Sequence, residues 1–536
     1  MPDRRQVLMS AAALASLAML RAPSARANIS ITLTSHYQVV RFIDADSVEM
    51  INGHAHAMVR RGETFLGCTL VDVVPGDFVV MEDFTAIDGD MLVVDLTGVR
   101  WRLGKTAEGT GGGPDLHGHT ADEIASSTGD LLADDLLSGG GDPVYEDVAA
   151  ILPPISHVTG DMWNFIGPRG GPAVPFAADG TCTGFDAAVF QPSIASVRAG
   201  GGVLTGLVGG YLPCVRFVYP EGVGTWTETL AYVALDDGPV HGRVARIEGG
   251  KLAWVKGMVA GSAGAVDGDG EFHAGLAALK AGWDKALAPG MKVDLPDGRL
   301  ADMARHSLVR AMISGGGGVA STLAAWGLGD SSVTIAPFSG PTRLSLPLDG
   351  QGRLAGDDAA GEGYAAIAAD RIPQALLTTW SAMAHLATRG GWMAVAGRSL
   401  LDGEALPYSA TAQAAVPFLL RELLAFEDQN TLWLGRGMPK AWLADGKLVF
   451  IDDIATRWGR ISFATDSRIS KEHRIAAKVV FPAAGIGATT RFRFRTGQPI
   501  RHVTLGDKSW KDFDAASGEI NLPAGMGGTV ILEIRY

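Results

Sequence analysis

The pattern of apolar and polar residues changes character along the chain. From residue 28 to about 270, short runs rich in Val, Ile, Phe and Tyr alternate with Gly, Pro and Asp, as at 31–33, 37–43 and 215–219. Many short apolar runs separated by turn residues are typical of a β-sandwich. One part of this stretch, residues 104–141, is rich in Gly, Asp and Ser and poor in large apolar side chains. We expect a long surface loop or an insertion there.

From residue 272 the apolar residues recur with the period of a helix. They share one face if residues 272–287 and 300–313 each form a helix. The sequence Pro-Asp-Gly at 296–298 predicts the turn between these two helices. The four glycines at 315–318 are expected to end the second helix, because glycine is a poor helix former.

Two further helices are predicted before residue 430. The first covers about 364–388 and is expected to break near Pro373. The last covers about 411–426, and Pro417 is expected to kink it, because proline cannot donate the backbone hydrogen bond of a helix interior. The sequence thus predicts a region of helical hairpins.

After residue 431 the chain returns to short alternating or apolar runs, which lie at 448–451, 460–463, 476–481, 491–494 and 530–535. Residues 491–495 read Arg-Phe-Arg-Phe-Arg, so a strand there has one apolar face and one cationic face. The predicted fold class is a multidomain α and β protein. Its predicted domains are an N-terminal β-sandwich at 28–271, an α-helical hairpin domain at 272–430 and a C-terminal β-sandwich at 431–536.

The first 27 residues have the sequence features of an export signal. The pair Arg4-Arg5 precedes an Ala-rich apolar run at 7–20, and Ala25-Arg26-Ala27 forms a small-residue cleavage site. Paired arginines before a mildly apolar run indicate a twin-arginine signal, with an ordinary secretion signal as the alternative. No other window reaches about 18 apolar residues, so we expect no stable membrane span in the mature chain. The predicted location is periplasmic or secreted, with the twin-arginine translocase as the partner during export.

Composition narrows the function classes. The 536 residues are 47% hydrophobic and 19% charged, which is ordinary for a folded protein. The net charge of −13 argues against nucleic acid as a partner, because binding phosphates requires a basic surface. Gly-x-Gly-x-x-Gly after a strand, Cys-x-x-Cys and haem motifs are missing from the sequence, so we predict no cofactor.

The spacing of the cysteines and histidines indicates neither a set of disulfides nor a metal site. Cys68, Cys182 and Cys214 allow at most one disulfide, and a Cys182–Cys214 pair is left open. The pairs His54/His56 and His117/His119 each lack a third ligand at fixed spacing. We therefore predict no metal site.

Three strings near the C-terminal end of the helical region carry a family resemblance. They are FLLRELLAFED at 418–428, TLWLGRGMPKAWL at 431–443 and ATRWGRISF at 455–463. Together with the order of β, helical and β regions, they resemble the bacterial six-hairpin glycosidase-like proteins. Shorter strings at 207–213 and 280–300 are similar to the same family. The resemblance implies an (α/α) toroid of helical hairpins between two β domains, and a carbohydrate ligand or substrate.

Two features depart from that family. The predicted helical domain, 272–430, has 159 residues, whereas about twelve helices with their loops need roughly 300. A partial toroid is therefore expected. In the loop around Trp392 the family pattern implies an acidic residue soon after the Trp, but this chain has Val395 and Ala396. Both departures leave open a relative that has lost its active site.

Glycoside hydrolysis uses two carboxyl groups, one as the acid and one as the base or nucleophile. Asp357, Asp358 and Glu362 lie just before and within the start of a predicted helix. We take Asp358 and Glu362 as catalytic candidates and Asp357 as a substrate-binding candidate. The alternative is that these carboxylates only cap the helix start.

Acidic residues elsewhere in the helical region have weaker signals. Glu404, in a Gly-containing loop, is a third catalytic candidate, with a solvated turn as the alternative. Glu422 and Glu427, in and just after the last helix, are expected to be exposed or salt-bridged.

Aromatic side chains beside carboxylates would suit the apolar faces of sugar rings. Trp392, in a Gly-flanked loop, and Tyr408 are substrate-binding candidates. Trp326 is a weaker candidate of the same kind, and Trp380 lies on the predicted buried face of its helix. His385 is also a substrate-binding candidate, with a histidine on the helix surface as the alternative.

Three functions follow from these observations. The first is an exported glycoside hydrolase that uses paired carboxylates on a poly- or oligosaccharide. The second is a non-catalytic relative that binds glycans or scaffolds an envelope assembly. The third is a polysaccharide lyase, which would need a Tyr or His base.

Overall fold

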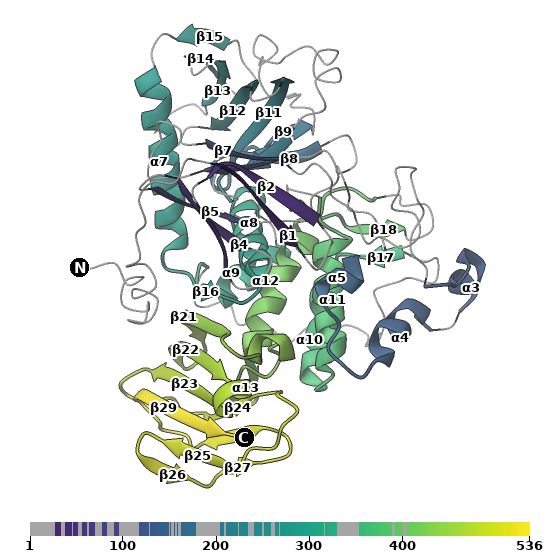
Figure 1. Ribbon diagram of the computed structural model, residues 1–536, viewed down its shortest axis with the longest axis vertical. Coiled ribbons are helices and arrows are strands. Elements are labelled where there is room, and N and C mark those ends of the chain that lie inside the picture. Colours follow the sequence, from purple (N-terminus) through teal and green to yellow (C-terminus); the bar gives the residue numbers. More distant parts are fainter. Residues whose placement is uncertain are drawn as a thin grey trace.

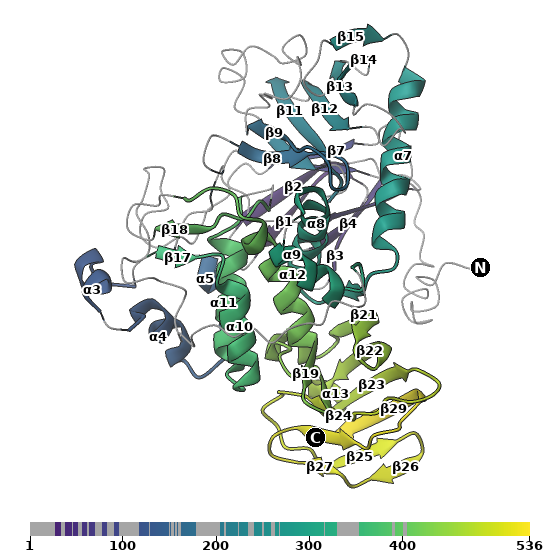
Figure 2. The same ribbon diagram turned by 180° about the vertical axis from the view of Figure 1, so that it is seen from behind.

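The computed structural model describes most of the chain from residue 27 to its end. The described residues are 27–33, 38–45, 47–51, 56–61, 64–69, 78–82, 91–95, 117–127, 129–149, 151, 155, 158, 162–177, 204–207, 211–222, 225–233, 241–248, 251–258, 263–266, 269–315, 317–329, 353–388, 392–399 and 405–536. The strands of 204–266 lie at one end of the molecule and the C-terminal strands at the other, with the helices of 298–424 between them (Figures 1 and 2).

The described part of the N-terminal region contains fifteen strands in antiparallel sheets. The sheet orders are β1-β2-β7-β6, β3-β4-β5, β8-β9 and β10-β11-β12-β13-β14-β15. The bounds are β1 Ala27–Leu33, β2 Gln38–Ala45, β3 Ser47–Ile51, β4 His56–Arg61, β5 Thr64–Thr69, β6 Phe78–Glu82, β7 Met91–Asp95, β8 Met162–Ile166, β9 Val174–Ala177, β10 Leu204–Leu207, β11 Cys214–Gly222, β12 Thr225–Val233, β13 His241–Glu248, β14 Lys251–Met258 and β15 Ala263–Val266. The prediction that this region consists of short β-strands is confirmed. Their grouping into one sandwich domain stays a prediction.

Of the two alternatives predicted for residues 104–141, the long surface loop is wrong for the described second half, and the insertion stays a prediction. Three short helices are present in and just after this segment: α3 Ala121–Ser126, α4 Leu131–Ser138 and α5 Tyr145–Ala149. Thr120 and Glu123 form a capping box at the start of α3, and Asp130 accepts a hydrogen bond from the backbone N–H of Ala133 in α4. Capping groups therefore compensate for the few apolar side chains that made this segment look like a loop.

Six helices follow in the described residues between 269 and 424. Their bounds are α7 Asp269–Leu287, α8 Gly298–Ser314, α9 Gly317–Ala325, α10 Ala359–Ala368, α11 Ile372–Ala384 and α12 Ala410–Leu424, and two short strands, β17 Arg353–Ala355 and β18 Gly397–Ser399, pair beside them. Every predicted helix is confirmed, and the expected break falls between α10 and α11, with Pro373 in the first turn of α11. The closed or partial toroid stays a prediction.

The glycine run ends the second predicted helix, as expected: α8 stops at Ser314, and Gly315, which has a φ of 64°, is its C-cap. The sequence did not predict that another helix, α9, begins within the same run, at Gly317. The glycines therefore form a short turn between two helices, because a single residue with positive φ is enough to end a helix. Trp326, just after α9, donates a hydrogen bond from its indole to the Pro417 carbonyl of α12 at 2.7 Å, which fixes α9 against α12.

The C-terminal strands form two sheets, of orders β16-β21-β22-β23-β29-β25-β26 and β19-β20-β24-β28-β27. The elements are β16 Lys292–Asp294, β19 Ala425–Asp428, β20 Thr431–Leu434, η4 Lys440–Leu443, β21 Leu448–Thr456, β22 Gly459–Arg468, α13 Ile469–Glu472, β23 Arg474–Phe481, β24 Thr489–Arg493, β25 His502–Leu505, β26 Lys508–Trp510, β27 Phe513–Asp514, β28 Glu519–Leu522 and β29 Gly528–Arg535. Phe463 of the first sheet packs on Phe492 of the second, with ring centroids 5.9 Å apart. One edge strand, β16, comes from between α7 and α8, so the helical region contributes directly to this part of the fold.

The alternating Arg-Phe segment has the two faces that its sequence predicts. Phe492 and Phe494 are buried in the core. On the other face, Arg493 pairs with Asp370 after α10, and Arg495 pairs with Asp142 at 2.6 Å. The cationic face is therefore a contact between the C-terminal strands and earlier parts of the chain, and its charges are neutralised within the protein.

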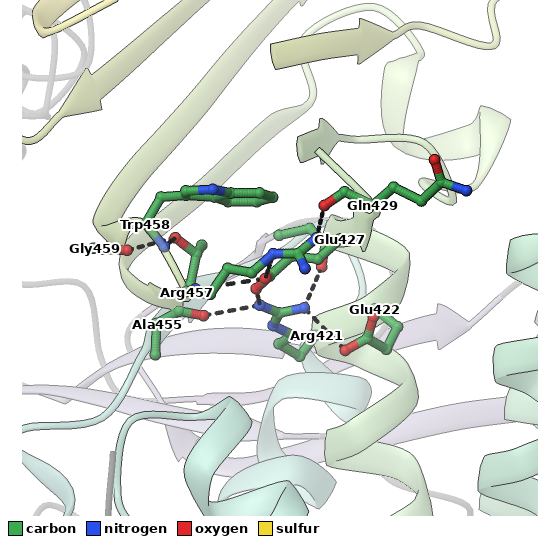
Figure 3. Close-up of polar contacts among 10 residues, drawn as sticks. Arg421, Glu422, Glu427, Gln429, Ala455, Arg457, Trp458 and Gly459 are labelled. Atoms are coloured by element: carbon green, nitrogen blue, oxygen red, sulfur yellow. Dashed lines mark hydrogen bonds and ion pairs between the residues drawn. The ribbon is translucent and has the colours of Figure 1, made fainter. Parts of the chain in front are cut away.

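An ionic cluster around the buried Arg421 joins α12 to the C-terminal strands; we call Arg421, Glu422, Glu427 and Arg457 the Arg421 cluster (Figure 3). Arg421 donates to Glu422 Oε1 at 2.9 Å, to Glu427, and to the Ala455 carbonyl at 2.8 Å. Arg457 pairs with Glu427 at 3.3 Å. The salt-bridged alternative for Glu422 and Glu427 is confirmed. The resembling strings at 418–428 and 455–463 thus contact each other, which gives their charged residues a structural role.

The predicted export signal lies almost wholly outside the described residues, since β1 begins at its last residue, Ala27. Cys182 also lies outside them, so its pairing with Cys214 stays open. Within the part of the chain that the structure describes, every helix is too short or too polar to cross a membrane.

Candidate functional site

Residues 356–358 form a turn just before α10, which we call the acidic turn, and this turn packs closely against the rest of the helical region. Gly356 donates a backbone hydrogen bond to the Ala396 carbonyl at 2.8 Å. A Cβ at Gly356 would collide with the Val395 carbonyl and crowd the side chain of Ala412. This close approach explains the glycine and fixes the position of the two residues that follow it, Asp357 and Asp358.

Asp357 ties the acidic turn to the start of α12. Its carboxylate accepts a hydrogen bond from the hydroxyl of Ser409. Ser409 is the N-cap of α12, and its hydroxyl also accepts from the backbone N–H of Ala412 at 3.2 Å. The neighbouring Tyr408 is thereby placed beside the acidic turn. The structure thus brings Asp357 and Tyr408, two of the predicted binding residues, to one place.

Asp358 and Glu362 lie one turn apart at the start of α10. The backbone N–H of Glu362 donates to the Asp358 carbonyl at 3.0 Å, so the two side chains are near neighbours on the helix surface. Asp358 is the N-cap residue and is exposed, yet its side chain makes no capping hydrogen bond. The capping alternative therefore does not account for Asp358. Glu362 is half-buried.

Three polar residues of α8, His306, Arg310 and Ser314, form a stripe that reaches Tyr408; we call them the α8 stripe. They are spaced by four residues and so share one face of the helix. His306 and Arg310 are fully buried, whereas Ser314 is exposed. Tyr408 shares a 3.5 Å hydrogen bond with Ser314, and the stripe therefore leads from the surface at Tyr408 into the core.

Aromatic rings surround the inner end of this stripe. The ring of Phe165, in β8, meets that of Tyr408 edge to face at 5.4 Å between centroids. The guanidinium of Arg310 lies over the same Phe165 ring, 5.5 Å from its centroid. Phe165 thus contacts both Tyr408 and Arg310, and β8 closes one wall of the site.

Burial controls the protonation of these groups. It lowers the pKa of Arg310 to about 9 and, together with the Arg310 charge, places the pKa of His306 well below its usual value. Burial also raises the pKa of Tyr408, while its hydrogen bond with Ser314 and the Arg310 charge act in the opposite direction. At neutral pH the site therefore holds one cation, a neutral imidazole and a neutral phenol.

The apolar pattern of residues 300–313 predicts a helix but does not indicate the α8 stripe. The available signal was the four-residue spacing of His306, Arg310 and Ser314 beside those apolar positions. That spacing alone does not tell a buried polar stripe from a solvated face, because most such faces are exposed.

Trp392 is placed differently from the other binding candidates. Its side chain is only 5% exposed and belongs to the hydrophobic core. Its backbone has a φ of 51°, and its carbonyl accepts a hydrogen bond from Gln413 at 2.8 Å. The ring therefore presents little surface to a sugar in this conformation. Trp326 and Trp380 are also buried, and for Trp380 this confirms the prediction.

His385 is buried, so its predicted place on a helix surface is wrong. It follows α11, and its Nε2 donates to the Val148 carbonyl of α5 at 2.7 Å. Burial, helped by the nearby Arg398 charge, lowers the pKa of His385 to about 3. His385 thus fastens α5 to the end of α11 as a neutral donor.

This arrangement predicts an acid-sensitive contribution to stability. In the unfolded chain His385 takes up a proton below about pH 6.5, but in the folded protein it stays neutral down to about pH 3. Stability from this group is present above pH 6.5 and lost as the pH falls, by about 2 kcal/mol between pH 7 and pH 5. His385→Gln, which keeps a donor for Val148, should lose about 2 kcal/mol less than wild type over that interval, measured by urea unfolding at both pH values. The exposed His473→Asn is the control, and an unchanged pH dependence in His385→Gln would contradict the assignment.

The remaining candidates give no site. Glu404 and His54 lie outside the described residues. His119 bonds to Asp135 at 3.0 Å. Where side chains are described, no group of three or more His, Cys, Asp or Glu is placed to hold a metal ion.

No family model matches the chain, and no curated protein matches it. Among solved structures, the chain is similar to the crystal structure of Ara127N-Se, a GH127 β-L-arabinofuranosidase from Geobacillus stearothermophilus T6, at 10% sequence identity and a TM-score of 0.19. The match covers 45% of this chain and 42% of that chain, so the chain spans about two fifths of that protein's length. A likeness of this size carries no argument about function, and membership of the six-hairpin glycosidase-like family stays a prediction.

Proposed function

We propose that the protein is an exported glycoside hydrolase that acts on a poly- or oligosaccharide. Its site would comprise the acidic turn at 356–358, the start of α10, and Tyr408 with Ser409. The observation that carries this proposal is Asp358, an exposed carboxylate at a helix start that does no capping and lies on a turn braced by Asp357 and Ser409. The Arg4-Arg5 signal supports export to the periplasm or the medium.

The roles follow from the chemistry of the glycosidic bond. One carboxyl group protonates the leaving oxygen, and the other acts as base or nucleophile. Asp358 and Glu362 are assigned to this pair, because they lie one turn apart with one exposed and the other half-buried. Asp357, held by Ser409, would accept hydrogen bonds from sugar hydroxyls, and the ring of Tyr408 would contact an apolar sugar face.

A specific observation favours a polysaccharide lyase as the second candidate. A lyase needs a base that removes a proton from the sugar carbon beside a carboxylate, and a cation near that carboxylate. Tyr408 is the candidate base: burial raises its pKa, and the hydrogen bond with Ser314 and the nearby Arg310 charge act against that rise. The two candidates share the same place in the fold but use different side chains.

Incubation of the purified protein with a panel of polysaccharides and oligosaccharides tests the proposal. A hydrolase produces new reducing ends without ultraviolet absorbance, whereas a lyase produces an unsaturated uronide that absorbs. We expect new reducing ends alone. Absorbing product would select the lyase, sugar binding without any product would select a non-catalytic glycan-binding relative, and neither binding nor product would contradict both enzymatic candidates.

A further inference from the structure

Arg310 is a buried cation without an acidic partner in the described structure. Its side chain is fully buried. Its Nε donates to His306 Nε2 at 3.4 Å and its Nη2 to the Leu212 carbonyl at 3.5 Å, both at the long end of hydrogen bonding. Its Nη1 is buried and makes no hydrogen bond. None of these contacts is anionic, so no residue in the described part of the chain neutralises the charge.

Three other arginines with buried or nearly buried side chains have carboxylate partners. Arg421 has Glu422 at 2.9 Å, and Arg495 has Asp142 at 2.6 Å. Arg299 likewise has Asp297 at 2.9 Å. A buried cation without such a partner is costly, because desolvation of the charge is not repaid by an ion pair. Arg310 therefore differs from these three arginines, and a positive charge that a protein keeps at such a cost is typical of a binding site.

The position of Arg310 fits a ligand that enters beside Tyr408. Arg310 lies one helical turn inside Ser314, which is exposed and hydrogen-bonded to Tyr408. Ser409, the residue that follows Tyr408, is hydrogen-bonded to Asp357 of the acidic turn. Tyr408 and the guanidinium of Arg310 both contact the ring of Phe165, so a ligand that displaced Tyr408 would lie close to Arg310.

We propose that Arg310 binds the carboxylate of an acidic saccharide, so that the substrate is a uronate-containing glycan. A planar guanidinium donates two parallel hydrogen bonds to a carboxylate, and Nη1 is a donor with no present acceptor. This inference rests on the proposed function, since it names the class of sugar that the same site takes.

Binding of matched charged and neutral ligands tests the inference. The probes are trimers of galacturonate and of glucuronate, each as the free acid and as the fully methyl-esterified form, titrated into the purified protein by calorimetry. The ester keeps the sugar rings and removes the charge. We expect the free acid of one trimer to bind about tenfold or more tightly than its ester, as a charge-assisted hydrogen bond predicts.

Two variants separate a binding role from a structural one. Arg310→Met should abolish the preference for the acid while leaving the melting temperature unchanged or raised, because it removes a buried charge that has no partner. Arg310→Lys should retain part of the preference, because it keeps the charge and loses the bidentate geometry. Arg468→Met, which removes a partly exposed arginine, is the control for loss of one positive charge and should retain the full preference.

The outcomes are distinct. Equal binding of acid and ester by wild type overturns the inference and leaves the proposed function standing. A preference for the acid that persists in Arg310→Met also overturns the inference, whatever the melting temperature of that variant. Failure of all four trimers and of every neutral glycan to bind overturns the proposed function and the inference together.

Discussion

Replacement of Arg421 by methionine should lower the free energy of unfolding by about 3–5 kcal/mol, which is the usual cost of removing one partner from a buried ionic group. Arg421 and Glu422 are each only 1% exposed, and Glu427 depends on the same guanidinium. Methionine fills a similar volume but donates no hydrogen bond. The two carboxylates and the Ala455 carbonyl would then lose their shared donor, and α12 would lose its ionic contact with the C-terminal strands.

Urea unfolding measures this effect. The matched control is Arg468→Met, which removes a partly exposed arginine paired with Asp466 at 3.2 Å and should cost less than about 1 kcal/mol. If both variants lost the same stability, the Arg421 cluster would have no special role in joining the two regions.

The pH dependence of the Arg421→Met cost is a second signature. Burial raises the pKa of Glu422 to about 7 despite the Arg421 charge, and removal of Arg421 favours the protonated form further. A carboxyl group whose pKa is raised by folding stabilises the protein below its unfolded value and loses that contribution as the pH rises through the folded value. The cost of the substitution should therefore be greater at pH 8 than at pH 5. A cost that is larger at pH 5 would contradict the assigned protonation of Glu422.

Asp358→Asn and Glu362→Gln should each lower the rate of glycan cleavage by about a hundredfold or more, because each removes a proton donor or acceptor from the reacting bond. The substitutions preserve side-chain size. Asp358 makes no capping hydrogen bond, so its replacement should leave the melting temperature nearly unchanged. Initial rates on the substrate found by the glycan panel measure the effect.

A matched control is available at another helix start. Asp134 is an exposed carboxylate in the first turn of α4, and Asp134→Asn should leave the rate unchanged. If Asp358→Asn and Glu362→Gln were as active as Asp134→Asn, the paired-carboxylate mechanism would be excluded, and Tyr408 would become the residue to replace.

Local patterns were sufficient to predict α7, α8, α10, α11 and α12 and part of the strands. The apolar period of α8 and α12 and the Pro373 break depend only on nearby residues, so the sequence contains that information. The helices α3 and α4 were missed because capping side chains, not apolar periodicity, define them. The addition of β16 to the C-terminal sheet was missed because strand pairing over 150 residues leaves no local pattern.

The candidate site was predictable only in part, for the same reason. Asp357, Asp358 and Tyr408 could be selected by residue type and loop position. The burial of His385 and Trp392, and the approach of Arg310 to Tyr408, depend on how α5, α8 and β8 pack around them. Such contacts between distant segments are a property of the tertiary structure, and residue spacing does not encode them.

The most direct test of the central claim is a crystal structure of the protein with a bound saccharide from the glycan panel. The account predicts the sugar at the acidic turn, within hydrogen-bond distance of Asp358 and in contact with Tyr408. A saccharide bound elsewhere, with the acidic turn and Tyr408 unchanged, would contradict it.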